Sequence, residues 1–317
     1  MNDTLIHQIV ICSNRGPDAL NKVIESIKQC TFVNEIKLLI VNNDSTLSAS
    51  SFHQLIESHA DAFADLLVIH SSPGLVNARN AALNCAECDV ITFIDDDVAV
   101  PQEFHVRILS KFLSDSELVG CSPYIAGEYD WGKSSNWLRT FNKKKLKKHL
   151  GKVTKSGENY WFYPTSNINS QNVDWLPGCC MSYSFPKVSK LTFSASLQNG
   201  PTEGYSLGED VDFSLRARQF GQLELLESLQ IQHFKSPSAR DNSTRMAFSK
   251  GMWLIYLAKN HNEKVKISSV LSHQFLQILY QMLRIVFMRK NSIKELSQKV
   301  KTIQGMLFEL IRPRLVD

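Results

Sequence analysis

The chain has 317 residues, enough for one large α/β domain with an appendage or for two modest domains. Hydrophobic residues make up 43% of it and charged residues 21%, which excludes a disordered or collagen-like chain. The net charge of +4 is too small to indicate nucleic-acid binding, and we expect no nucleic-acid partner.

Short apolar runs alternate with helical patterns over the first hundred residues. Because these runs are apolar at successive positions and are separated by helices, they predict a mostly parallel sheet covered by helices. The four predicted strands lie at residues 8–12, 36–41, 66–69 and 90–94.

Helices are predicted between these strands. Apolar residues from Leu20 to Ile27 follow the three-and-four spacing of a helix, which we expect Asp18 to cap. Two further helices are predicted at about 51–64 and 76–85.

The second half of the chain is less regular. Residues from about 130 to 172 are rich in Lys, Asn, Ser and Trp and indicate a long insertion. A helix is predicted from Glu209 to about Gln219, and beyond Pro237 the pattern is mainly helical. We therefore expect an α/β domain over 1–237 and a C-terminal helical region over 238–317.

Three consecutive carboxylates, Asp95, Asp96 and Asp97, directly follow the fourth predicted strand. Ligands of open α/β sheets bind beyond the carboxyl ends of the strands. Clustered carboxylates there are costly unless a cation neutralises them, and Mg²⁺ or Mn²⁺ suits oxygen ligands best. Such an ion can stabilise a departing diphosphate. The alternative is an acidic, solvated turn or a helix cap.

A second acidic pair, Glu209 and Asp210, stands at the start of a predicted helix. Carboxylates are common there because they complement the positive end of a helix, so a structural role stays open. A functional pair would use one carboxylate as general base on an acceptor hydroxyl. His233, after the alternating run 225–231, is either structural or the last ligand of a metal site.

In combination, these segments resemble the family 2 glycosyltransferases with the GT-A fold, particularly rhamnosyltransferase-like bacterial members that build surface polysaccharides. The resemblance covers about residues 8–235 and implies a Rossmann-like sheet flanked by helices. Its landmarks occur in order and are Ser13-Asn14-Arg15, Val41 to Ser45, Gly74 to Asn80, Asp95 to Asp97, Val173 to Gly178, Gly208 to Phe213 with Arg216 and Gly221, and His233.

The resemblance also implies residue roles. Asp97, Asp95 and His233 would hold Mn²⁺ or Mg²⁺. Asp210 would be the catalytic base, with Glu209 and Trp175 facing the acceptor. The nucleotide-sugar-binding residues would be Ser13, Asn14, Arg15, Asn42, Asp44, Arg79, Asp95 and Asp96.

Two features depart from the family pattern. Asn42 stands where the family usually has an Asp that accepts the imide N–H of the base. Its amide oxygen can accept the same hydrogen bond without carrying a charge. Residues 184–206 lack the family's usual Arg-rich, Gly-Gly-Phe segment.

The implied activity is inverting transfer of a sugar from a UDP- or dTDP-sugar to a hydroxyl of a glycan or lipid-linked saccharide, as in capsule or O-antigen synthesis. A sugar-phosphate nucleotidyltransferase, or another Mg²⁺-dependent phosphoryl-transfer enzyme, is the alternative. A nucleotidyltransferase should open with a Gly-rich phosphate loop, whereas residues 13–17 contain one Gly. A dehalogenase-like phosphatase should carry its acidic motif after the first strand and not the fourth.

The cellular setting is predicted from what the sequence contains. No run approaches the roughly 20 apolar residues of a transmembrane helix, and the apolar run at 9–11 is too short for a signal peptide. The seven cysteines include one C-x-x-C, Cys85 and Cys88, with no partner pair, which favours a reducing compartment. We expect a cytoplasmic protein at the inner face of the plasma membrane.

Two segments bear on membrane contact. Residues 142–152 are densely cationic, and this pattern is typical of either a solvated loop or a site for anionic headgroups. Residues 275–288 are mostly apolar and are followed by Arg289, Lys290 and Lys294. They predict either a helix lying in the membrane interface or one packed on the domain or on a second copy in a homodimer.

Overall fold

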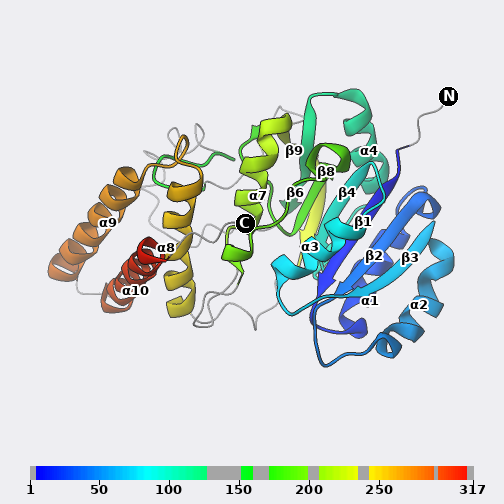
Figure 1. Ribbon diagram of the computed structural model, residues 1–317, viewed down its shortest axis with the longest axis horizontal. Helices are drawn as coiled ribbons and strands as arrows, with labels where there is room; N and C mark the ends of the chain where they lie inside the picture. The colour runs from blue at the N-terminus through cyan, green and yellow to red at the C-terminus, as the bar shows by residue number, and fades with distance from the viewer. Residues whose placement is uncertain are drawn as a thin grey trace.

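The computed structural model describes residues 5–126, 151–159, 171–198, 207–234, 243–288 and 292–312 (Figure 1). An α/β domain built on one sheet lies beside three C-terminal helices. Most of the predicted insertion at 130–172 lies outside the described residues, as does the cationic segment 142–152 except for its last two positions. The boundary between the two regions near residue 237 stays a prediction.

The four predicted strands form the parallel half of the sheet. They are β1 (His7–Ser13), β2 (Ile36–Asn42), β3 (Asp65–His70) and β4 (Val90–Asp95), arranged in the order β3-β2-β1-β4. Cys12 pairs with Asp95 and Ser13 with Asn42, so the ends of β1, β2 and β4 meet at one edge. The predicted parallel arrangement is confirmed for this half.

The other half is mixed and was not anticipated in detail. β8 (Cys180–Ser184) runs antiparallel to both β4 and β6 (Leu118–Ala126), and β9 (Gln222–His233) runs parallel to β6. Two short strands, β5 (Val98–Ala99) and β7 (Gln171–Val173), pair antiparallel with β9. The sheet is therefore mixed, and its parallel half is formed by the N-terminal part of the chain.

Helices cover the sheet as predicted, with two corrections. α1 (Pro17–Lys28) begins after Gly16, so Asp18 lies in the first turn and caps nothing with its side chain. Pro17 fits the first helical position because its missing N–H would have no partner there. The helix expected over 51–64 is only α2 (His53–His59), between the short 3₁₀ turns η2 (Ala49–Phe52) and η3 (Ala60–Ala62).

Four helices and three 3₁₀ turns complete the described part of the domain, and of these only α3 and α7 bear on the site directly. They are α3 (Leu75–Cys85), α4 (Phe104–Ser114), α6 (Phe185–Val188), α7 (Glu209–Ala217) and the 3₁₀ turns η1 (Val33–Glu35), η4 (Ala195–Leu197) and η5 (Arg218–Phe220).

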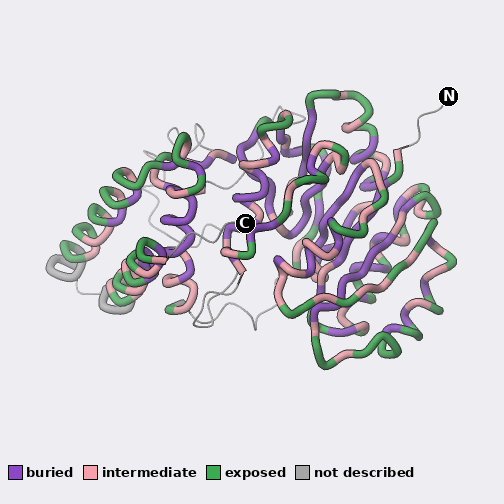
Figure 2. Tube along the Cα trace, in the orientation of Figure 1, coloured by how far each residue is buried: buried purple, intermediate pink, exposed green. Residues whose placement is uncertain are grey.

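Two apolar clusters, one on each face of the sheet, make the core. One contains Ile9, Ile24 and Phe104, and the other contains Phe93 and Phe213 and continues into the C-terminal helices. Figure 2 shows the buried strands between more exposed helices. Burial of these faces is the main force that holds the strand ends in register.

The C-terminal region consists of α8 (Ser243–Asn260), α9 (Ile267–Met288) and α10 (Ser292–Ile311), with α8 nearest the domain (Figure 1). Gly251 of α8 and Gly305 of α10 let these two helices touch through their backbones. A methyl group on Gly251 would lie 1.9 Å from the carbonyl oxygen of Thr302. Across the described parts of the chain, no helix has both the length and the apolar character to cross a bilayer.

Three contacts fix α8 and its C-terminal turn to the domain. The indole of Trp253 lies over Gly208, where an added Cβ would be 1.7 Å from Nε1. His261 Nε2 lies 2.8 Å from the buried carboxylate of Asp212, and Lys264 Nζ lies 2.6 Å from that of Asp174. The C-terminal helices therefore pack directly on the start of α7.

Candidate active site

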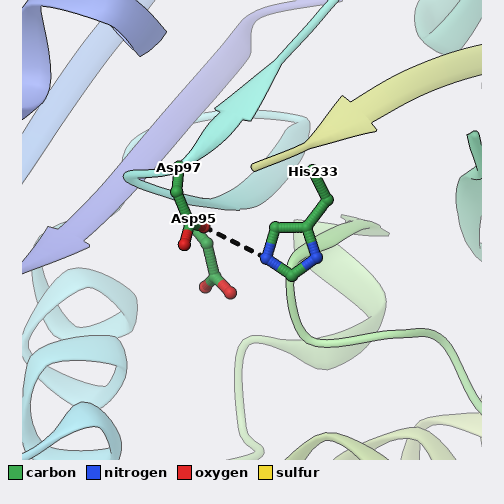
Figure 3. A group of neighbouring side chains, drawn as sticks. All are labelled: Asp95, Asp97 and His233. Carbon is green, nitrogen blue, oxygen red and sulfur yellow. Dashed lines mark ion pairs between the residues drawn. The ribbon is translucent and has the colours of Figure 1, made fainter. Parts of the chain in front are cut away.

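Asp95, Asp97 and His233 come together beyond the end of β4 (Figure 3). Each offers one ligand atom, and these atoms all lie within 4.8 Å of one another. His233 Nε2 is 3.1 Å from Asp97 Oδ1. Among the residues that the structure describes, this is the one group of acidic, His or Cys side chains with metal-binding spacing.

Strand pairing explains how His233 reaches the acidic turn. β5 follows Asp97 directly, and Val98 pairs with His233 at the end of β9. The backbone N–H of Phe234 also donates to the carbonyl of Asp97 across 2.7 Å. The sheet therefore brings a histidine from far along the sequence to the acidic cluster.

The electrostatics of this group favour a bound cation. Burial is the main cause that raises the pKa of Asp95 to about 6; Arg79 opposes this shift and the neighbouring Asp97 adds to it. The folded protein thus holds the carboxylate of Asp95 in a place that disfavours its charge. Two carboxylates and an imidazole form a donor set that fits Mn²⁺ or Mg²⁺, whose charge would offset that cost.

Asp96, the middle carboxylate, is held by the end of β1 and not by the group in Figure 3. Ser13 Oγ donates to it, and Arg15 pairs with it through Nε at 2.9 Å and through Nη2. Arg15 also lies 3.9 Å from Asp97. Ser13 is buried and Asn14 is exposed beside it. Within the triplet, Asp95 and Asp97 therefore lie with His233, whereas Asp96 contacts Ser13 and Arg15.

Arg79 on α3 joins the two acidic regions. It is 2% exposed, and its Nη1 donates to Glu209 Oε1 across 3.0 Å. Its Nη2 donates to the carbonyl of Gly178 across 2.8 Å and lies 3.7 Å from Asp95 Oδ1. A buried guanidinium with partners on three segments acts as a bridge between the end of β4 and the start of α7.

Asp210 is partly buried beside this bridge. Its Oδ2 accepts the backbone N–H of Gly178 across 3.0 Å, and its Oδ1 accepts that of Val211 across 2.8 Å. Burial, and next the charge of Glu209, raise the pKa of Asp210 to about 7, whereas Arg79 lowers it. A carboxyl that titrates near neutrality can accept a proton from a hydroxyl and later release it.

Gly178 is a close-approach position in this arrangement. A Cβ there would lie 3.2 Å from both Asp210 Oδ2 and Arg79 Nη2, tighter than ordinary contact. A side chain at residue 178 would therefore force Asp210 or Arg79 to move by a few tenths of an ångström.

Asn42 and Asp44 shape the loop after β2. The Nδ2 of Asn42 donates to the carbonyl of Asp44, and its Oδ1 accepts the N–H of Asp44, both across 3.1 Å. Asp44 in turn accepts two hydrogen bonds from Thr46, which lower its pKa. Both side chains lie on the same edge as the acidic triplet, since β2 neighbours β1.

Trp175 occupies a different environment from the other predicted residues. It is 1% exposed and lies within the apolar core cluster with Phe213. Its predicted contact with an acceptor stays a prediction.

The sequence interpretation assigned no role of their own to two residues near the site. Asp212 is buried and accepts from Arg216 Nη2 at 2.6 Å and contacts His261 at 2.8 Å. The i to i+4 spacing of Asp212 and Arg216 could have predicted their pair. Nothing in the local sequence pointed to His261, because its partner lies 49 residues away.

Comparisons with known proteins identify the family and the fold. The family model described as glycosyl transferase family 2 matches residues 8–185. No curated protein matches the sequence.

Solved structures with the same fold share little sequence with this chain. A mannosyltransferase from Pyrobaculum calidifontis, in complex with GDP-Man and Mn²⁺, has a TM-score of 0.58 at 10% identity, covering 98% of this chain and 88% of that one. GalNAc-T7 with UDP, GalNAc and Mn²⁺ has a TM-score of 0.57 at 13% identity, covering 83% of this chain and 51% of that one. S. aureus TarS 1-349 with UDP has a TM-score of 0.53 at 15% identity, covering 96% and 81%.

Proposed function

The chain belongs to glycosyl transferase family 2, and we propose that it moves a sugar from a UDP- or dTDP-sugar to a hydroxyl of a glycan or lipid-linked saccharide, with inversion at the anomeric carbon. The observation that carries this proposal is the pairing of two acidic regions through Arg79. One is the group of Asp95, Asp97 and His233, and the other contains Asp210.

The donor end of the site is proposed at the edge formed by β1, β2 and β4. Asp97, Asp95 and His233 would hold Mn²⁺ or Mg²⁺, and such a cation, when bound, stabilises charge on the departing diphosphate. The solved mannosyltransferase and GalNAc-T7 were both crystallised with Mn²⁺ and a nucleotide, which supports the proposal by analogy of fold.

The nucleotide itself would lie along the ends of β1 and β2. We assign its contacts to Ser13, Asn14, Arg15, Asn42, Asp44 and Asp96, which lie at this edge. Arg15 would serve twice, since it holds Asp96 in place and offers a cation beside the diphosphate. Arg79 is too buried to leave its protein partners easily, so we assign it to positioning Asp95 and Glu209.

Asp210 is proposed as the catalytic base. Its pKa near 7 lets the ionised form exist at neutral pH while keeping appreciable basicity. Its Oδ1 and Oδ2 are each fixed by one backbone N–H, which orients the carboxylate before the acceptor arrives. Glu209, tied to Arg79, and Trp175 would shape the acceptor side.

The wider setting is also part of the proposal. Residues 1–237 would form the catalytic domain, and residues 238–317 the helical region that packs on it. Synthesis of a cell-surface polysaccharide at the inner face of the plasma membrane would supply both a cytoplasmic donor and a lipid-linked acceptor.

The test is a screen of UDP-, dTDP- and GDP-sugars for thermal stabilisation with and without Mn²⁺. A ligand at a hundredfold excess over its dissociation constant should stabilise the fold by about 2.7 kcal/mol. We expect a Mn²⁺-dependent shift with a UDP- or dTDP-sugar that Asp97→Asn abolishes. Release of pyrophosphate from a nucleoside triphosphate and a sugar 1-phosphate, with no response to any nucleotide sugar, would instead identify a nucleotidyltransferase.

A further inference from the structure

Helix α9 turns its apolar side toward solvent. Phe275 is 66% exposed and Leu276 is 61% exposed, and Leu271, Leu279, Met282 and Leu283 are exposed along the same helix. Figure 2 shows this exposed side on the outer flank of the helical region, farthest from the domain. Contiguous apolar surface of this kind usually marks a binding surface.

Three polar residues of α9 face the other way. Gln274 is buried, at 3% exposed, and His273 and Gln277 are partly buried. Gln277 Nε2 lies 2.6 Å from His273 Nε2, Lys299 of α10 donates to the side-chain oxygen of Gln277, and His273 lies 3.7 Å from Glu158. α9 therefore packs on its neighbours through these polar groups together with the buried Val270.

This orientation of α9 is the reverse of the one that water favours for a surface helix. A helix on the surface of a globular protein buries its apolar stripe and exposes its charged face. Here the apolar stripe is outward and carries no charged residue from Ile267 to Leu283. Such an outer side favours contact with another apolar medium.

The charges near this helix decide between a membrane and a second copy. Between Lys266 and Glu295 the sequence contains no carboxylate and four cations, Arg284, Arg289, Lys290 and Lys294. A symmetric dimer through α9 would bring these like charges toward one another. Anionic lipid headgroups complement them, and an apolar stripe flanked by cations is typical of a helix in the membrane interface.

We propose that the outer side of α9, with Phe275 and Leu276 at its centre, docks the protein onto an anionic lipid surface with the helix lying in the plane of the interface. The docking does not depend on the proposed glycosyl transfer, and its test needs no activity.

The experiment is flotation of the full chain with vesicles through a density gradient. One set of vesicles contains phosphatidylcholine alone, and the other also contains phosphatidylglycerol. We expect the protein to float with the anionic vesicles, with weaker binding at higher salt, and to stay mostly unbound with phosphatidylcholine alone. Absence of flotation with the anionic vesicles overturns the proposal.

Matched variants test the surface itself. Phe275→Ser with Leu276→Ser should weaken binding about tenfold or more, because two exposed apolar side chains no longer enter the lipid. The control, Phe220→Ser with Leu113→Ser, changes the same residue types at exposed positions of the domain and should bind as the unchanged protein does. Equal flotation of both double variants overturns the proposal.

Two further measurements complete the test. Arg289→Gln with Lys290→Gln should lower binding to the anionic vesicles, and unchanged binding contradicts the anionic preference. Sedimentation of the protein alone tests whether a second copy of the chain covers this surface. A dimer that Phe275→Ser with Leu276→Ser converts to monomers, without vesicle binding by either form, assigns the face to a second copy and overturns the membrane assignment.

Discussion

Arg79 and Glu209 form a buried ion pair, with Nη1 and Oε1 3.0 Å apart, although one lies on α3 and the other begins α7. The pair spans the sheet edge between the proposed metal group and the proposed base. Removing one partner of a buried ion pair leaves the other charge without compensation, which typically costs 3–5 kcal/mol.

Arg79→Met should therefore destabilise the protein by about 3–5 kcal/mol, measured as the free energy of unfolding in urea. Adding Glu209→Gln should recover part of this loss, because the uncompensated carboxylate is then gone. A double variant no more stable than Arg79→Met alone would show that the two side chains do not interact energetically.

Asp97→Asn should weaken Mn²⁺ binding by more than about a hundredfold, since even outer contacts of metal sites contribute 10–100-fold. The matched control is Asp96→Asn, which changes the adjacent carboxylate that Arg15 and Ser13 hold. Calorimetric titration of both variants with Mn²⁺ checks the difference. An equal loss of Mn²⁺ affinity in the two variants would show that Asp97 matters no more for metal binding than Asp96 does.

Asp210→Asn should lower kcat by about 10²–10⁴-fold while leaving the fold intact. The asparagine side-chain oxygen can still accept one of the two backbone N–H groups that Asp210 now binds. Steady-state rates and the melting temperature, measured side by side, check both halves. A variant with normal turnover would exclude Asp210 as the base.

The pH dependence of the rate should report the same carboxyl. Because the base must be ionised, kcat/KM should rise with pH through about 7, the pKa to which burial and Glu209 raise Asp210. In Asp210→Asn this rise should be absent from the residual activity. The stability of the fold should change in the opposite direction. The folded protein keeps the proton of Asp210 up to about pH 7, whereas the unfolded chain loses it near pH 4, so Asp210 should lower the free energy of unfolding as the pH rises from about 4 to 7.

His261→Ala should destabilise the protein by about 1–3 kcal/mol, because it leaves one oxygen of the buried Asp212 without its 2.8 Å partner. His261→Asn offers a donor of similar reach and should recover part of the loss. Urea unfolding checks this. An unchanged midpoint in His261→Ala would mean that the contact does not anchor the C-terminal helices to α7.

The parallel half of the sheet was predictable because each strand is a continuous apolar run with a helix after it. β6 and β8 were harder to assign, since Gly120, Ser122 and Ser182 interrupt their apolar character. Ser122 is buried there and donates to the carbonyl of Cys180, a long-range partner that no local pattern reveals.

The sequence singled out the acidic residues of the candidate site, but it did not predict the contacts that join them. Asp95, Asp97 and Asp210 stand out because carboxylates next to buried segments are unusual. That Arg79 would bridge them depends on how α3 and α7 pack, which the sequence near each residue does not encode. The split of the acidic triplet, with Asp96 turned toward Arg15, likewise follows from the neighbouring position of β1.

The pairing of Val98 with His233 joins two parts of the chain that lie far apart in the sequence. Asp95 and Asp97 precede the imidazole by more than a hundred residues. In the proposed metal site, a shortened chain that ends before residue 233 would keep both carboxylates and lack the nitrogen donor. Such a chain should therefore bind Mn²⁺ more weakly than the full protein.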